Sequence, residues 1–205
     1  MTIVILGIVA AGMLIIRKWD EPLSLNGWEY LGILTAAVLM KKMIPIIISE
    51  TGGGCLLLSV VGGCLLLACV TDLMICQVYN FTWWPALSAA AILLWQSLWT
   101  SKISEPKEIL ISLLTFLILQ FALFGRMYGR ADGYAFCVCA IVEASRGMKA
   151  AGFLAHMLLS YTLLLLVQAV RENLNKRGNL KKPVPFLPYI TISFWLVAIL
   201  GVLAK

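Results

Sequence analysis

The chain has 205 residues, of which 61% are hydrophobic and only 13% are charged, and its formal net charge is +6. A soluble domain of this size needs a more polar surface than this composition supplies, so a soluble globular class is excluded. The positive charge is expected to set orientation in a membrane and to attract anionic lipids, and it argues against a nucleic-acid partner.

Apolar segments recur along the whole chain. A spanning helix needs about 20 mostly apolar residues, and continuous runs exclude a transmembrane barrel, whose strands alternate. The candidate spans are residues 2–16, 53–71, 83–100, 107–125, 133–148, 149–170 and 187–203. Residues 28–49 leave two interpretations open, because Lys41 and Lys42 interrupt them: an eighth span or an interfacial helix. The expected fold is an all-α polytopic membrane helix bundle of about seven or eight transmembrane helices.

Basic residues in short loops predict the orientation of these spans. The loop 171–182 holds five Lys and Arg residues against one Glu, so it is expected in the cytoplasm. Counting spans back from it places the loop after Asp72 and the loop before Asp132 on the same side. The loop 101–108 then falls on the opposite side.

The six cysteines include no C-x-x-C pair, so they predict neither a zinc site nor any other metal centre. Cysteine in an apolar helix usually packs as a small side chain. The glycines beside them, in "GGGCLLL" and "GGCLLL", indicate close helix packing through small residues.

Asp72 closes one apolar segment and Asp132 opens another. A carboxylate at such an edge is a candidate functional residue. Taken singly, each is explained as a helix-end charge that satisfies backbone N–H groups. Taken together, the two are expected on one face at one depth, where a pair of carboxyls can share a proton and act as base and acid. Gly129 would let the chain approach closely before Asp132.

The sequence "TDLMICQVYN", residues 71–80, resembles the first catalytic motif of the type IV prepilin peptidases, the GxGD-type aspartic proteases. In that motif an Asp at a helix end is followed eight residues later by Asn. Asp72 and Asn80 keep this spacing, with Tyr79 where the family usually has Pro.

Two further motifs follow in the family's order. "GRAD", residues 129–132, is similar to G-x-G-D, with Ala131 in place of the second Gly. Two residues beyond Asp132, Tyr134 stands where Lys is frequent. "KKPVPFLPYITISFW" is similar to the proline-rich start of the family's last helix. In it Pro185, Phe186 and Pro188 match, and Leu187 replaces Gly.

The resemblance implies a catalytic membrane domain over residues 50–205, preceded by N-terminal transmembrane or interfacial helices over residues 1–49. It implies an aspartic endopeptidase that removes the short leader of prepilin-like precursors at the cytoplasmic face of the membrane, with Asp72 and Asp132 as the catalytic residues. No cofactor and no metal are expected. Residues 17–27 are too short and lack the cysteines of the family's methyltransferase insertion, so no methyltransferase activity is expected.

Two other classes of function stay open. One is a small transporter or channel subunit that uses the two aspartates as proton or ion sites. The other is a catalytically silent relative that assembles pilin-like subunits.

Three further polar residues have simpler interpretations. His156, the single histidine, is expected to be a satisfied packing residue. Glu143 is expected to form an ion pair with Arg146, about 16 Å along the helix from Asp132. Glu50 is expected to be a helix-end charge. No G-x-S-x-G or H-E-x-x-H motif is present, so serine and zinc protease chemistry lack their residues.

Overall fold

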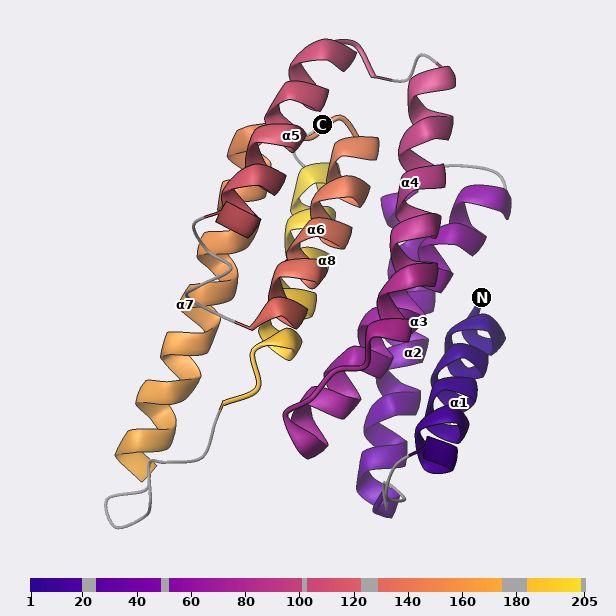
Figure 1. Ribbon diagram of the computed structural model, residues 1–205, viewed down its shortest axis with the longest axis vertical. Coiled ribbons are helices and arrows are strands. Elements are labelled where there is room, and N and C mark those ends of the chain that lie inside the picture. Colours follow the sequence, from indigo (N-terminus) through magenta and orange to yellow (C-terminus); the bar gives the residue numbers. More distant parts are fainter. Residues whose placement is uncertain (20–24, 49–51, 101–102, 123–128, 175–183, 204–205) are drawn as a thin grey trace.

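The computed structural model describes residues 1–19, 25–48, 52–100, 103–122, 129–174 and 184–203. Over these ranges the chain is helical and contains no strand (Figure 1). The elements are α1 (Thr2–Trp19), α2 (Gly27–Ile47), α3 (Gly52–Ile75), the short 3₁₀ helix η1 (Asn80–Thr82), α4 (Trp83–Trp99), α5 (Pro106–Ala122), α6 (Arg130–Ser145), α7 (Ala150–Leu174) and α8 (Leu187–Leu203).

Each apolar segment expected to be helical is a helix, which confirms the all-α bundle. Residues 28–47 belong to one continuous helix: α2 passes through Lys41 and Lys42 and includes Pro45 near its end. Among the described residues, three helices are long and apolar enough to cross a membrane, namely α2, α3 and most of α7, and α8 contains a shorter apolar stretch. The fold is therefore that of a membrane-type helical bundle.

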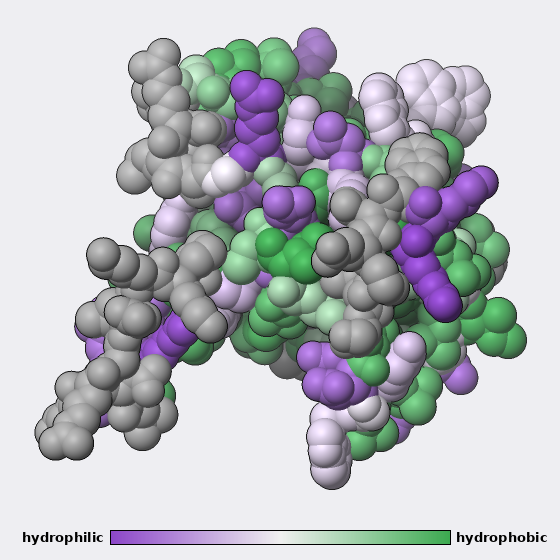
Figure 2. Space-filling model, turned by 60° about the horizontal axis from the view of Figure 1, so that its bottom comes forward, coloured by the Kyte–Doolittle hydropathy of each residue, from purple (hydrophilic) through white to green (hydrophobic). Residues whose placement is uncertain are grey.

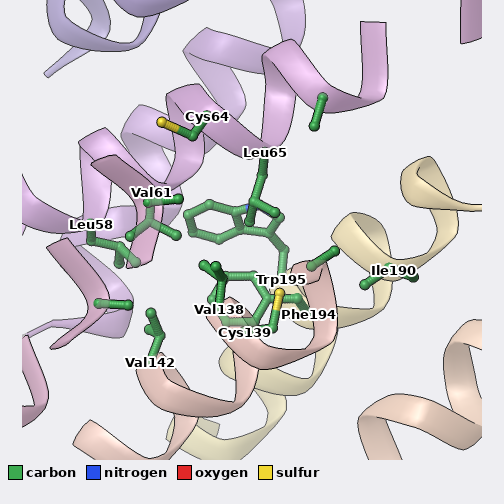
Figure 3. Close-up of a cluster of buried hydrophobic side chains, with 14 of the residues drawn as sticks. Leu58, Val61, Cys64, Leu65, Val138, Cys139, Val142, Ile190, Phe194 and Trp195 are labelled. Carbon is green, nitrogen blue, oxygen red and sulfur yellow. The ribbon is translucent and has the colours of Figure 1, made fainter. Parts of the chain in front are cut away.

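The bundle is organised around α3 and α8. In Figure 1, α1 to α4 form one side of the molecule and α5 to α8 the other. α3 packs against α1, α2, α4 and α8, while α6 packs against α4, α5 and α8. The core fills the space between α3, α6 and α8, where the Trp195 indole of α8 lies against Val61 and Leu65 of α3 and Val138 of α6 (Figure 3).

Small residues bring α1 and α3 close together, as the glycine pairs indicated. A Cβ atom on Gly63 would lie 3.3 Å from the Cα atom of Ile5 and 3.1 Å from the Ile8 side chain. A Cβ atom on Gly12 would overlap the side chain of Leu67. Packing at this distance depends on the absence of those Cβ atoms, which is how small residues act in membrane helix pairs.

The outer surface of the bundle is apolar. Long aliphatic side chains of α7, including Leu158, Leu165 and Leu166, are exposed. On α4, exposed tryptophans stand at both ends of the helix: Trp84 near its start, Trp95 and Trp99 near its finish. An exposed apolar surface of this extent is typical of contact with lipid, and tryptophan is enriched where a helix meets the membrane surface.

The chain alternates between the two ends of the bundle. The lower side of the view in Figure 1, which we call the aspartate end, is where α1, α3 and α7 finish. The helices α6 and α8 run upward from that side, and their starts lie above the ends of α3 and α7. The connections from α4 to α5 and from α6 to α7 lie at the opposite end. In Figure 2, which is turned so that the aspartate end comes forward, hydrophilic side chains are set among apolar ones. The end of α3, which carries Asp72, and the start of α6, which carries Asp132, thus lie at one end of the bundle, as the count of spans predicted.

Candidate active site at the aspartate end

Asp72 lies in the last turn of α3. The helix ends at Ile75, and Cys76 adopts a left-handed conformation with φ of 52°. Its backbone N–H donates to the carbonyl oxygen of Asp72 at 3.0 Å, which closes the helix. Glycine is the usual residue at such a position, and any other residue costs about 1–2 kcal/mol there.

The carboxylate of Asp72 caps a different helix. Its Oδ2 atom accepts a hydrogen bond of 3.1 Å from the backbone N–H of Leu187, the first residue of α8. Both residues are buried. Because the donor is a backbone group, the replacement of the family's Gly by Leu187 leaves this bond intact. Pro188 in the same turn has no N–H and so needs no partner there.

Asp132 caps its own helix. It lies in the first turn of α6, is half-buried, and its Oδ2 atom accepts a hydrogen bond of 3.1 Å from the backbone N–H of Gly129. A Cβ atom on Gly129 would lie 3.3 Å from that oxygen, which is tight. Ala131 is half-buried beside it. The capping interpretation of Asp132 is therefore confirmed, and Gly129 is the residue that lets its carboxylate reach back.

The two carboxylates also interact with each other. Asp132 precedes the apolar stretch that begins at Gly133. Burial first, and the charge of Asp72 second, raise the pKa of Asp132 to about 6, while the Gly129 hydrogen bond opposes this rise. A carboxyl responds in this way when a second negative charge is close and water is partly excluded. Residues 60 apart in the sequence are thus near enough for the charge of Asp72 to act on Asp132, which also caps its own helix.

Aromatic side chains of α6, of α7 and of the residue just before α8 lie near Asp132. The ring of Tyr161, from α7, lies 5.1 Å from that of Phe186. The charge of Asp132 acts on the hydroxyl of Tyr161. Phe186 in turn contacts Phe136 of α6 at 6.0 Å. Tyr161 was not predicted, because one tyrosine inside the apolar run of α7 gives no signal of its own.

Three other motif positions are placed as follows. Asn80 begins η1 and is exposed, and none of the contacts described for it reaches either aspartate. The ring of Tyr134 packs 6.1 Å from Trp83 and 6.0 Å from Phe121, so it joins α6 to the start of α4 and the end of α5. Pro185 lies half-buried just before α8.

Within the described ranges, no group of three or more His, Cys, Asp or Glu residues is arranged to hold a metal ion. A hard cation such as Ca²⁺ takes six or more oxygen ligands. The site instead offers two carboxyls, each with one oxygen bonded to a backbone N–H. This arrangement suits proton transfer better than it suits ion coordination.

One expected contact is wrong. The partner of Glu143 is His156, whose Nδ1 atom lies 3.0 Å from Glu143 Oε1, and both side chains are buried. Arg146, at the end of α6, instead donates from Nη2 to the carbonyl oxygen of Ala198 at 2.7 Å. The two residues are three positions apart, yet they contact different helices: Glu143 contacts α7 and Arg146 contacts α8. His156 is a buried, bonded residue as expected, and Glu50 lies outside the described residues.

No model of a known protein family matches the chain, and comparison with curated proteins and with solved structures likewise found no match. A proposal for the function of this chain therefore rests on its motifs and on the geometry of the aspartate end.

Proposed function

We propose that the chain is a membrane aspartic endopeptidase similar to the type IV prepilin peptidases, in a short form without methyltransferase activity. Its substrates are prepilin-like precursors, from which it removes a short leader peptide. Seven or eight of its helices cross the membrane, and the aspartate end faces the cytoplasm.

The observation that carries this proposal is the interaction of Asp72 with Asp132. The charge of Asp72 contributes to a pKa of about 6 for Asp132. Two carboxyls in a partly dry site cannot both ionise cheaply, so the pair holds one proton up to about pH 6. Asp72 is the better ionised partner, because the N-terminal turn of α8 donates to it through Leu187.

The chemistry follows from that one shared proton. Ionised Asp72 accepts a proton from a water molecule, whose oxygen then forms a bond with the carbonyl carbon of the scissile peptide. Protonated Asp132 donates its proton to the leaving nitrogen as the C–N bond breaks. The proton taken from water restores the single proton of the pair, so water is the nucleophile and no other reactant is consumed.

The charge distribution supports the proposed orientation. Four exposed basic residues belong to segments that end or begin at the aspartate end, and the sequence between α7 and α8 adds four more: Arg17, Lys18, Arg130 and Arg171, then Lys176, Arg177, Lys181 and Lys182. Toward the opposite ends of their helices stand four exposed lysines, Lys41, Lys42, Lys107 and Lys149. Basic residues near span ends favour the cytoplasmic side and attract anionic lipid headgroups. Anionic lipids are therefore proposed as the membrane partners of this end.

Co-expression with a prepilin-like precursor tests the activity. Cleavage should lower the mass of the precursor by the mass of its leader, and only in membranes that contain the chain. An unchanged precursor mass beside an expressed and membrane-inserted chain would contradict the proposal.

Cysteine labelling in intact cells and inverted vesicles tests the orientation. Cys76 is exposed at the aspartate end, whereas the other five cysteines are buried, so the native chain already carries one reporter. A cysteine placed at exposed Ser104, in a Cys76→Ser background, reports the opposite end. Cys76 should react only from the cytoplasmic side and the residue at 104 only from outside. Reaction of both from one side would overturn the proposed topology.

A catalytically silent scaffold is the second candidate, and the capping hydrogen bonds favour it. Asp72 and Asp132 each stabilise a helix start without any need for chemistry. An Asn side chain retains a capping oxygen but cannot act as acid or base. A scaffold would therefore keep its function in Asp→Asn variants, whereas a peptidase would lose it.

A further inference from the structure

A second ionisable cluster lies deep in the bundle, apart from the aspartate end. His156 of α7 is 1% exposed at its side chain and Glu143 of α6 is fully buried. The imidazole is enclosed by Phe136 of α6, with ring centres 5.5 Å apart, and by Phe194 of α8, at 6.1 Å. Ionisable residues at this depth are costly and therefore call for a role.

Both ring nitrogens of His156 face acceptors. Nε2 lies 3.0 Å from the carbonyl oxygen of Ile190, and Nδ1 lies 3.0 Å from Oε1 of Glu143. A carbonyl oxygen only accepts, so the first contact requires a proton on Nε2. Neutral imidazole has a single N–H, which would leave a bare Nδ1 lone pair against a carboxylate oxygen. Both contacts are satisfied only if the pair holds one more proton, on Nδ1 or on Glu143.

The surrounding charges are compatible with that extra proton. With it, Glu143 and His156 together are net neutral, whichever of them carries it. Among the described residues Arg146, which caps the end of α6, is the other charged group nearby: its charge acts on Glu143, and its guanidinium donates to the carbonyl oxygen of Ala198 on α8. Cys139, one turn before Glu143, also faces the carboxyl. Beyond the Nδ1 contact, Glu143 has no polar partner among the described residues, which disfavours a bare buried anion.

The pair connects the helices that carry the two aspartates. Glu143 belongs to α6, which begins with the turn of Asp132. Ile190, the carbonyl partner of His156, belongs to α8 one turn after Leu187, whose N–H holds Asp72. From α7, His156 is therefore hydrogen-bonded to α8 and in contact with the carboxyl of Glu143 on α6.

We propose that Glu143 and His156 form a proton-holding pair in the bundle core that fixes α8 against α6, and that His156 is thereby a positioning residue for the two aspartates. We call the link that His156 makes between α6 and α8 the clamp. The pair and the clamp rest on the contacts of His156 with Glu143 and Ile190. The effect on catalysis rests on the proposed peptidase function.

Spectroscopy of the whole chain in lipid tests the proton directly. His156 is the single histidine, so ¹⁵N-histidine labelling reports on it alone. At pH 7.5 the native chain should show either both ring nitrogens protonated, or a proton on Nε2 together with an infrared carboxylic-acid band that disappears in Glu143→Gln. Glu143→Gln should show a neutral imidazole with its proton on Nε2, because the Gln amide donates to Nδ1. A native chain with one ring proton and an ionised Glu143 would overturn the pair.

A distance measurement tests the clamp. Spin labels at Arg130 and Val184, in a Cys76→Ser background, report the separation of the starts of α6 and α8. His156→Phe keeps the ring volume and removes both contacts, so the distance distribution should broaden or shift. Glu143→Leu, which breaks only the link to α6, should do the same. Glu143→Gln, and the control Ser193→Ala at the same α7–α8 interface, should leave it as in the native chain. An unchanged distribution in both disruptive variants would overturn the clamp.

The kinetic consequence separates this inference from the proposed function. If the chain cleaves precursors, His156→Phe should lower kcat about tenfold or more with little change in KM, because misplaced catalytic groups slow chemistry more than binding. Ser193→Ala should not do so. If neither the native chain nor any variant cleaves a precursor, the peptidase proposal fails. The spectroscopic and distance results still show whether Glu143 and His156 form the proposed pair.

Discussion

The two ends of the bundle each hold a pair of carboxylates, and the pairs differ in what balances their charge. At the opposite end, exposed Glu105 and Glu108 flank the ammonium group of Lys149, which contacts both and lies 2.9 Å from Glu108. At the aspartate end, Asp72 and Asp132 are balanced by the backbone N–H groups of Leu187 and Gly129.

This difference in partners gives opposite acid–base behaviour. The hydrogen bond from Lys149 lowers the pKa of Glu105, and the two glutamates raise the pKa of Lys149 to about 12, so Glu105 and Lys149 stay charged. Burial and the charge of Asp72 raise the pKa of Asp132 to about 6. Of these two described pairs, the exposed one beside a cation has a lowered pKa at Glu105, whereas the partly buried one held by backbone N–H groups has a raised pKa at Asp132.

The largest expected effect comes from removing either aspartate of the pair. Asp72→Asn and Asp132→Asn keep an oxygen for the capping bonds, so expression and insertion should be unchanged. Each should reduce precursor cleavage by about 10²-fold to 10⁴-fold, the usual contribution of an acid–base group. Quantitative mass spectrometry of the precursor measures this. Near-native cleavage by either variant would show that the pair is not the catalytic centre.

The next largest effect is that of pH on the native chain. Activity should fall as pH rises through about 6, where Asp132 loses its proton, and should fall again in acid, where both carboxyls are protonated. Stability has the same sign: the folded chain holds a proton that the unfolded chain releases between pH 3.8 and about 6, so stability decreases as pH rises through that window. Rates with a solubilised precursor from pH 4 to 9 measure the first effect. A flat profile above pH 5 would contradict a shared proton.

The smallest effect is expected at the opposite end. Glu105→Gln and Glu108→Gln remove exposed charges that face water and Lys149, and exposed ion pairs contribute little. Cleavage should change by no more than about twofold, and the pH profile should keep its shape. A shift in the pH profile of these variants would mean that the two ends are coupled, and would contradict their independent acid–base behaviour.

The sequence was sufficient for the helices and for placing the two aspartates at one end of the bundle. Long apolar runs specify helices whatever their partners, and the alternation of spans placed Asp72 and Asp132 at one end. Contacts that depend on helix rotation were beyond it. Glu143 and Arg146 are three residues apart on one helix, and only packing against α7 and α8 shows that they face different neighbours.

The site itself was predicted in part. The proline-rich segment before α8 was recognised by its resemblance, yet its physical role, a backbone N–H of Leu187 directed at Asp72, depends on a contact 115 positions away in the chain. Tyr161 escaped notice for a similar reason. An apolar run records that a helix is buried or faces lipid, and says nothing of which side chain lies next to a distant carboxyl.

The most direct test of the central claim is the titration of Asp132 in the native chain and in Asp72→Asn. The chain contains three aspartates, so ¹³C-aspartate labelling in lipid gives three carboxyl signals, which Asp→Asn variants assign. In the native chain Asp132 should titrate near pH 6. In Asp72→Asn its pKa should fall, while staying above the ordinary value of about 3.9 because burial remains. An Asp132 signal that titrates near 3.9, or that is unmoved by Asp72→Asn, would show that the two carboxyls do not form a pair.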